Sequence, residues 1–186
     1  VSGLRTTFLI DSWEVRISAS VGIARASEGG FDTQDTIRNA DVAMYVAKKE
    51  GKSQYCFFQE HMLIEHQRKI DIANAIEPGL ERGEFYICYQ LKVSSDGEPR
   101  GVEALVRWNS QTLGRVSPSD FVPIAERSGK ISALTDWVVE RVCRDVADYF
   151  QDLPVPILVS LNLSAYDLKR YQFSDFIRST FETYAV

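Results

Sequence analysis

The sequence predicts an α/β fold in two portions, a short α+β portion followed by a longer one that alternates strand and helix. Hydrophobic residues make up 45% and charged residues 25% of the 186 residues, as in packed globular proteins. Runs with two-residue periodicity alternate with runs of helical spacing. Residues 157–163 form an apolar, β-branched run that is typical of a strand buried on both faces. Strands followed by helices, repeated along the chain, predict a sheet or barrel with crossover connections.

The first portion is predicted to hold two strands, a helix and a further strand. A short strand at 7–10 is expected to pair with a longer one at 13–24, whose side chains alternate before becoming mostly apolar. Residues 35–50 carry apolar side chains at helical spacing, and Gly51 is positioned to end that helix. A last strand is expected at 54–58.

A polar helix is expected to connect the two portions. Residues 59–76 carry only a weak apolar stripe, which suits a helix that joins domains. Pro78 and Gly79 are expected to kink or stop it, because proline lacks the amide hydrogen that a helix interior needs.

The second portion is predicted to begin with a hairpin and to continue with helices and one buried strand. The turn around Asp96-Gly97 separates the two hairpin strands. The predicted elements are strands at 85–92, 101–108 and 157–163, and helices at 118–127, 133–150 and 173–184.

Charge and composition exclude several classes of protein. The net charge of -5 argues against broad electrostatic attraction to nucleic acid, so we expect no nucleic-acid partner. No apolar run reaches the roughly 20 residues of a membrane helix, and the first residues do not form a signal peptide. We therefore expect a cytoplasmic chain, attached to a membrane only through segments outside it. Cys56, Cys88 and Cys143 are odd in number and widely spaced, which predicts buried, reduced thiols without a disulfide or zinc site.

The end of the first portion resembles the C-terminal part of GGDEF domains, the diguanylate cyclase type. The similarity lies in the helix 40–52, Ala-Asp-Val-Ala-Met-Tyr-Val-Ala-Lys-Lys-Glu-Gly-Lys, and in the strand 20–24 before it. The resemblance implies that Lys48 and Lys52 face nucleotide phosphates, although family members usually have arginine at the position of Lys52. Alternatively, both lysines are only the cationic last turn of a helix. The signature turn and metal-binding carboxylates would precede Val1, so no cyclase activity is expected of this chain.

The second portion resembles the first part of EAL domains, the cyclic di-GMP phosphodiesterase type. Its motifs are Leu80-Glu81-Arg82-Gly83-Glu84-Phe85, Tyr89-Gln90, Gly101 to Trp108 (GVEALVRW), Val116-Ser117-Pro118, Phe121 to Glu126 (FVPIAE) and Leu161-Asn162-Leu163-Ser164. The resemblance implies a variant (β/α)8 barrel, incomplete here because only about three of its eight strands are expected. Chemistry in such barrels gathers at the C-terminal ends of strands, where Glu103 and Asn162 are predicted to lie.

The resemblance also implies a site for cyclic di-GMP. Glu103 and Asn162 would be ligands of Mg²⁺ or Mn²⁺, hard cations that prefer oxygen, and would help the metal to activate a water that attacks phosphorus. Arg107 would pair with a ligand phosphate. The remaining predicted ligand contacts are Gln90, Leu105, Ser117 and Pro118.

Each site residue also has a structural interpretation. Glu103 and Arg107 could be an ion pair on an edge strand, and Asn162 could cap a turn. Gln90 is followed by Leu91-Lys92, whereas the family usually has proline after the glutamine.

These resemblances predict a piece of a longer signalling protein, divided into a GGDEF end at 1–58, a linker helix at 59–79 and an EAL beginning at 80–186. The whole protein is expected to hydrolyse cyclic di-GMP to the linear dinucleotide; alternatively, its EAL domain is a receptor that binds without cutting, or an interaction scaffold. Further acidic ligands and the catalytic lysine would follow Val186, so this chain is expected to be inactive alone and to bind no metal. Its open barrel edges are expected to promote self-association.

Overall fold

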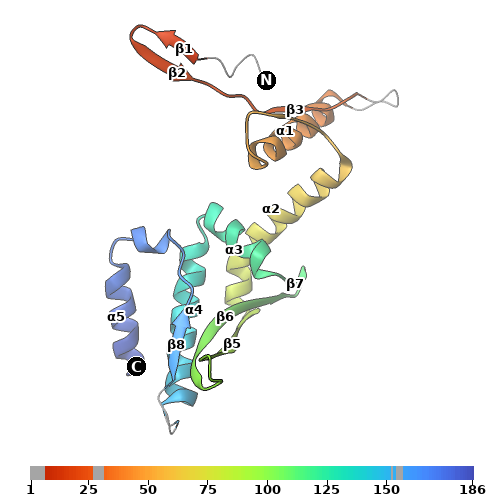
Figure 1. Cartoon of the computed structure of the whole chain (residues 1–186). Helices are drawn as coiled ribbons and strands as arrows, with labels where there is room; N and C mark the ends of the chain where they lie inside the picture. The colour runs from red at the N-terminus through yellow and green to blue at the C-terminus, as the bar shows by residue number, and fades with distance from the viewer. Residues whose placement is uncertain (1–6, 27–31, 152, 154–156) are drawn as a thin grey trace. The chain divides into compact units, whose positions relative to one another are not determined.

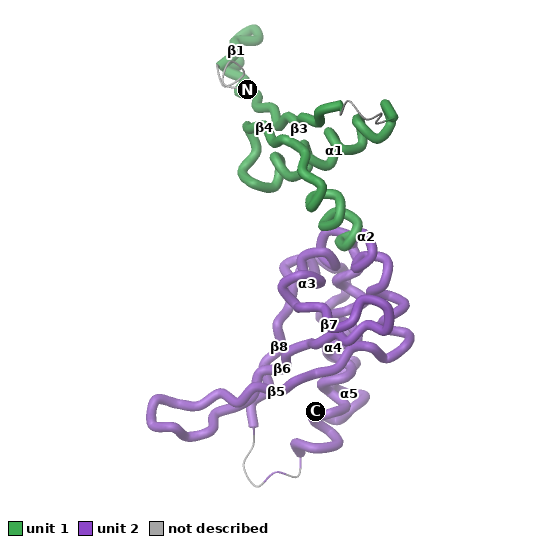
Figure 2. The backbone as a smooth tube through the Cα atoms, turned by 90° about the vertical axis from the view of Figure 1, so that its right-hand side faces the viewer, with its two compact units in different colours: residues 1–69 green, residues 70–186 purple. Residues whose placement is uncertain are grey.

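The computed structural model describes residues 7–26, 32–151, 153 and 157–186. The chain divides into two compact units, residues 1–69 and 70–186 (Figure 2). Helix α2 (Glu60–Glu81) contributes residues to both units. Each unit has its own hydrophobic core, so each is described by itself.

The first unit contains two small two-stranded sheets and a helix (Figure 1). An antiparallel hairpin pairs β1 with β2, and a separate parallel pair joins β3 to β4 across helix α1. Val42, Ala43 and Met62 form the buried centre of this unit. The element bounds are β1 (Thr7–Ile10), β2 (Trp13–Arg16), β3 (Val21–Ile23), α1 (Thr33–Lys49) and β4 (Tyr55–Phe57).

The prediction of a single strand over 13–24 was wrong, because residues 17–20 between β2 and β3 are not part of a strand. The reason is that the two ends of the run pair with different partners, β1 and β4. Helix α1 also lies very close to β3: a Cβ atom on Gly22 would stand 1.9 Å from the backbone oxygen of Ala40. The glycine is therefore required by the packing of α1 on β3.

The second unit contains a four-stranded sheet and helices that cover one of its faces (Figure 1). The hairpin, α3 and α5 occur where the sequence predicts them. The strand β7 was not predicted, and α4 begins two residues earlier than expected and passes into a π-helical turn. The element bounds are β5 (Phe85–Val93), β6 (Pro99–Ser110), β7 (Gly114–Val116), α3 (Pro118–Arg127), α4 (Ile131–Asp145), the π-helical turn (Val146–Phe150), β8 (Leu158–Leu161), a 3₁₀ turn (Asp167–Lys169) and α5 (Phe173–Tyr184).

Strand β6 is the centre of the sheet. Strand β5 pairs antiparallel along one side of it, and the other side pairs antiparallel with β7 and parallel with β8. The parallel β6–β8 pair is joined by a crossover that contains α3 and α4, which is the connection that an α/β barrel repeats. The mixed α/β fold class predicted from the sequence is therefore confirmed.

The prediction that 157–163 is buried on both faces was wrong for the described residues. Strand β8 pairs only with β6 among them, and the side chain of Leu158 is 71% exposed. The apolar, β-branched composition of residues 157–163 indicates that they form a strand. Burial of both faces of that strand additionally requires other elements to cover it on both sides. The same reason explains Cys88, predicted to be buried but exposed on the uncovered face of β5.

The core of the second unit lies between the sheet and helices α2, α3 and α4. Its centre is aromatic: the rings of Phe85 and Trp108 stack with centroids 4.8 Å apart, and Phe121 meets both edge-on. The buried members of this core are Ile72, Ile76, Phe85, Ala104, Trp108, Val116, Phe121, Ile124, Ala125, Ile131, Leu134, Val138 and Val142.

Pro78 and Gly79 were expected to kink or stop helix α2; the helix continues through both residues to Glu81, so it does not stop there. The buried Ile72 and Ile76 anchor the helix on the core, and this burial outweighs the loss of the one hydrogen bond that Pro78 cannot donate. Gly79 has a packing role: a Cβ atom there would stand 3.0 Å from Glu84 Oε2 and 3.1 Å from Trp108 Nε1. The glycine allows the helix to lie directly against the hairpin.

Candidate functional site

The polar residues of β6 share one face of the strand. Side chains alternate along a strand, so Glu103, Leu105 and Arg107 point away from the face that carries the buried Ala104 and Trp108. These three side chains are half-buried. The alternation therefore separates the residues that build the core from those that face away from the covering helices.

The register brings one further predicted residue, Gln90, to the same face. Gln90 on β5 lies directly opposite Glu103, and Ser160 on β8 lies opposite Glu103 on the other side. Strand β5 continues through Lys92, with an irregularity only between Lys92 and Val93, so Leu91 does not shift the strand at Gln90. Gln90 and Glu103 are thus cross-strand neighbours.

The side chains of Glu103 and Asn162 are in direct contact. Asn162 follows the last residue of β8, and its Nδ2 donates a hydrogen bond of 2.7 Å to Glu103 Oε1. Asn162 lies directly after the end of β8, as predicted. Glu103 does not lie at a strand end, so that part of the prediction was wrong: β6 continues beyond it to Ser110, where it pairs with β7. Rotation of the carboxamide by half a turn would replace Nδ2 with Oδ1, so the pair can present either a donor or an oxygen ligand next to the carboxylate.

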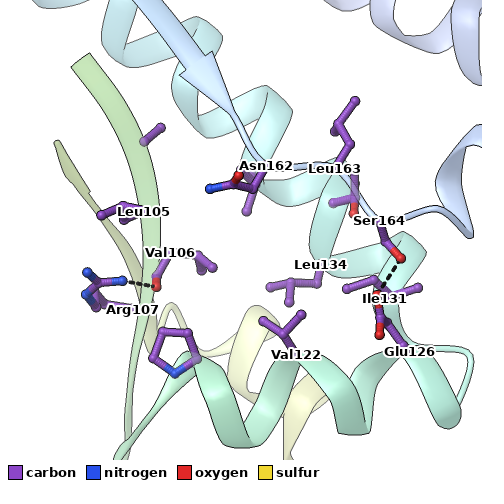
Figure 3. Close-up of a pocket in the computed structure, with 14 residues that line it drawn as sticks. Leu105, Val106, Arg107, Val122, Glu126, Ile131, Leu134, Asn162, Leu163 and Ser164 are labelled. Atoms are coloured by element: carbon purple, nitrogen blue, oxygen red, sulfur yellow. Dashed lines mark hydrogen bonds between the residues drawn. The ribbon is translucent and has the colours of Figure 1, made fainter. Parts of the chain in front are cut away.

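A cavity of about 200 Å³ lies between β6 and helices α3 and α4. Figure 3 shows Val106 on β6 pointing toward the apolar Val122 and Leu134, with Asn162 and Ser164 at another side of the cavity. Leu105 and Arg107 also line the cavity, but their side chains extend from the opposite side of the strand. Arg107 directs one guanidinium nitrogen back to the backbone oxygen of Val106 at 2.9 Å.

Ser117 and Pro118 lie at the beginning of α3, and both line a second cavity of about 450 Å³. Arg107 and Arg115 also line it. Arg107 therefore lines both cavities. Six of the predicted second-unit residues, Glu103, Asn162, Gln90, Leu105, Arg107 and Pro118, gather around β6, and Ser117 adjoins them through this second cavity.

A polar network behind Asn162 was not predicted as part of the site. Ser164 Oγ donates to Glu126 Oε1 on α3 at 2.7 Å, and Thr135 Oγ1 on α4 donates to Asp167 Oδ2 at 2.7 Å. Arg170 forms a two-fold contact with Asp136 at 2.7 and 2.9 Å. Glu126 and Ser164 are the last residues of two of the EAL-type motifs quoted above. Their membership in these motifs was the one sequence signal that could have indicated a role at the site.

Lys48 and Lys52 belong to the first unit. Lys48 is exposed in the last turn of α1, and Lys52 lies just beyond it with a positive φ of 61°. The amide of Lys52 donates to the backbone oxygen of Ala47 at 3.1 Å, which folds the chain back over the helix end. Both lysines thus lie at the C-terminal end of α1, where cations also interact favourably with the helix dipole.

The donor chemistry of Glu103 and Asn162 fits a hard divalent cation, because both side chains carry oxygen ligands. The described residues contain no group of three or more His, Cys, Asp or Glu side chains that could hold a metal ion. Glu103 and Asn162 offer two oxygen atoms of the kind that such a cation prefers. The described helices also include none that is long and apolar enough to cross a membrane.

Family models match both units of the chain. Residues 1–54 match the diguanylate cyclase GGDEF domain, and residues 73–186 match the EAL domain. A bifunctional diguanylate cyclase/cyclic di-GMP phosphodiesterase of Pseudomonas aeruginosa, MucR, is 34% identical over 96% of this chain and 26% of its own length. The cyclic di-GMP phosphodiesterase PdeR of Escherichia coli is 41% identical over 89% of this chain and 25% of its own length. The chain thus spans about a quarter of these relatives.

Solved structures of EAL proteins share the fold of this chain. A structure described as the PaMucR phosphodiesterase in complex with c-di-GMP superposes with a TM-score of 0.58 at 28% identity, covering 62% of this chain and 47% of that one. The EAL match covers more than half of the 186 residues, and the GGDEF match precedes it in the chain. The chain therefore belongs to the EAL domain family and, with its GGDEF segment, to the GGDEF-EAL tandem signalling proteins.

Proposed function

We propose that this chain supplies one side of the active site of a cyclic di-GMP phosphodiesterase, which hydrolyses the cyclic dinucleotide to its linear form. The observation that carries the proposal is the Glu103–Asn162 pair on neighbouring parallel strands, with Gln90 and Arg107 on the same face. The similarity to relatives named as cyclic di-GMP phosphodiesterases supports the substrate. The same ligand in the complex of the MucR enzyme supports it further.

Each residue has a proposed role at this site. Glu103 and Asn162 would hold a divalent cation, Mg²⁺ or Mn²⁺, which when bound supplies charge stabilisation and activates water. Arg107 would pair with a phosphate of the dinucleotide, since its planar guanidinium can donate two hydrogen bonds to one phosphate. Gln90, Leu105, Ser117 and Pro118 would contact the remainder of the ligand. The positive charge of the Arg107 guanidinium would locally attract an anionic ligand to a chain whose net charge is -5.

We propose that the whole protein carries out this reaction and that the 186 residues alone do not. Glu103 and Asn162 supply only two of the about six oxygens that surround Mg²⁺, and only Glu103 contributes a negative charge. We further propose a cytoplasmic location and the boundaries 1–58, 59–79 and 80–186 for the GGDEF end, the linker helix and the EAL portion. In the GGDEF end, Lys48 and Lys52 would face nucleotide phosphates.

The test is release of the linear dinucleotide from cyclic di-GMP by the full-length protein, with Mn²⁺ or Mg²⁺ added, compared with the Glu103→Gln variant. Hydrolysis by the wild type that the variant lacks supports the proposal. Tight binding of cyclic di-GMP without hydrolysis would replace the proposal with a receptor function. Absence of both would leave an interaction scaffold.

A further inference from the structure

The position of Asn162 is not fixed by the sheet. The β6–β8 register ends at Ala104 opposite Leu161, one residue before Asn162. The Asn162 side chain is exposed, and its contact in the strand region is with Glu103. An exposed side chain just beyond a strand end loses conformational entropy when it is held in one rotamer. Some other part of the chain must therefore hold the backbone that carries it.

The turn that follows Asn162 is closed by reciprocal hydrogen bonds. The amide of Ser164 donates to Asp167 Oδ2 at 3.3 Å, and the amide of Asp167 donates to the backbone oxygen of Ser164 at 3.0 Å. The amide of Tyr166 also donates to Ser164 Oγ at 3.3 Å. Ser164 and Asp167 thus form a closed turn, here called the Ser164 turn (residues 164–167), two residues after Asn162.

Hydrogen bonds with side chains on helices α3 and α4 hold the Ser164 turn in place. Ser164 Oγ donates to Glu126 Oε1 on α3 at 2.7 Å, a contact visible in Figure 3. Thr135 Oγ1 on α4 donates to Asp167 Oδ2 at 2.7 Å. Asp167 is 0% exposed, and a buried carboxylate is tolerated only when its oxygens are hydrogen-bonded. The fully satisfied network therefore fixes one geometry of the turn.

We propose that Glu126 is a positioning residue, which holds the Ser164 turn and through it places the Asn162 carboxamide beside the Glu103 carboxylate. The inference rests on the proposed function for its role in catalysis. Glu126 lines the same cavity as Asn162 and Ser164, so its contact with Ser164 lies next to Asn162. Side chains that orient metal ligands in this way commonly change metal affinity by roughly 10- to 100-fold when they are removed.

The first test measures Mn²⁺ binding to the full-length protein by electron paramagnetic resonance. Glu126→Ala and Ser164→Ala should each weaken Mn²⁺ binding by about 10-fold, and the double variant should be no weaker than either single one, because both remove the same contact. Glu126→Gln keeps an oxygen acceptor for Ser164 and should restore binding. Ser128→Ala is the matched control, since its hydroxyl donates to the backbone oxygen of Ile124 on the same helix at 2.8 Å but does not contact the turn.

The second test needs no metal and separates this inference from the proposed function. Side-chain amide relaxation of Asn162 is measured by nuclear magnetic resonance in the 186-residue chain. We expect an ordered amide in the wild type and in Ser128→Ala, and a mobile amide in Glu126→Ala. An equally ordered Asn162 amide in Glu126→Ala would overturn the positioning role. Failure of Glu103→Gln to change hydrolysis by the full-length protein would instead overturn the proposed function.

Discussion

Glu103 and Asn162 are 59 residues apart in sequence and joined by a 2.7 Å hydrogen bond. The crossover through α3 and α4 brings the end of β8 next to β6 and makes this contact possible. A carboxylate and a carboxamide at such a position can change partners when a cation or a phosphate arrives. The contact therefore gives the most direct predictions for the chemistry of the protein.

Removal of the negative charge at Glu103 should abolish hydrolysis. Glu103→Gln keeps the shape of the side chain and can still accept from Asn162, but it loses the charge that a divalent cation requires. We expect the rate of linear dinucleotide release by the full-length protein to fall by more than about 100-fold, since loss of a ligand costs at least as much as loss of its supporting partner. Glu98→Gln, an exposed carboxylate at the turn before β6, is the control and should keep the wild-type rate. An active Glu103→Gln enzyme would contradict the assignment.

Lysine at position 107 should not support ligand binding as well as Arg107 does. Arg107→Lys keeps the positive charge but loses the planar fork that can donate two hydrogen bonds to a phosphate. We expect the KM for cyclic di-GMP to rise about tenfold, which corresponds to roughly 1.4 kcal/mol of binding free energy. The measurement is steady-state hydrolysis by the full-length protein. Arg100→Lys makes the same exchange at an exposed position near the start of β6, and an equal KM change there would show a nonspecific effect of charge geometry.

Protonation of Glu84 in acid should make the second unit less stable. Burial raises the pKa of this carboxyl, but hydrogen bonds from Trp108 and Arg82 outweigh burial and hold the pKa below its ordinary value of 4.5. A pKa that is lower in the folded state contributes stability above the unfolded value, and this contribution is lost as the pH falls through the folded value.

The free energy of unfolding of the wild type should therefore fall more steeply than that of Glu84→Gln as the pH is lowered below about 4.5. Urea unfolding at a series of pH values measures the two slopes. Glu98→Gln removes an exposed carboxylate and should keep the wild-type slope. Parallel curves for wild type and Glu84→Gln would show that the Glu84–Trp108 contact does not favour the charged carboxylate.

The exposed edge of β8 should promote self-association of the 186-residue chain. Among the described residues β8 pairs only with β6, so its outer backbone groups are available to another strand. Lysine on an edge strand opposes such pairing, and Leu158→Lys should reduce the mass measured by light scattering at high concentration. Leu168→Lys is a matched control, because both leucines are 71% exposed but Leu168 lies in a 3₁₀ turn. A wild-type chain that stays monomeric would refute the expectation.

Local signals in the sequence predicted most of the second unit. Helix α3 begins at Pro118 and α5 begins at Phe173, as expected, because Pro118 is favourable at a helix start and the apolar spacing of α5 is regular. The strand expected at 101–108 lies within β6 and carries Glu103 and Arg107, as predicted.

Predictions that depended on distant partners were less successful. The helix-breaking tendency of Pro78 was overcome by burial of Ile76 against a sheet that lies later in the chain. The exposure of Cys88 and Leu158 depends on which elements cover the sheet, and no local pattern contains that information. The network around Asp167 was missed for the same reason, because its partner Thr135 is 32 residues away.

Strand β6 has a consequence for genetic screens. Odd-numbered positions from 103 to 107 hold the proposed chemistry, whereas the even-numbered Ala104, Val106 and Trp108 belong to or pack against the core. A saturation library across this strand, scored separately for cellular protein level and for cyclic di-GMP turnover, should give two phenotypes that alternate residue by residue. Ala104 and Trp108 variants would be lost from the pool of folded protein, while Glu103 and Arg107 variants would accumulate as abundant, catalytically silent protein.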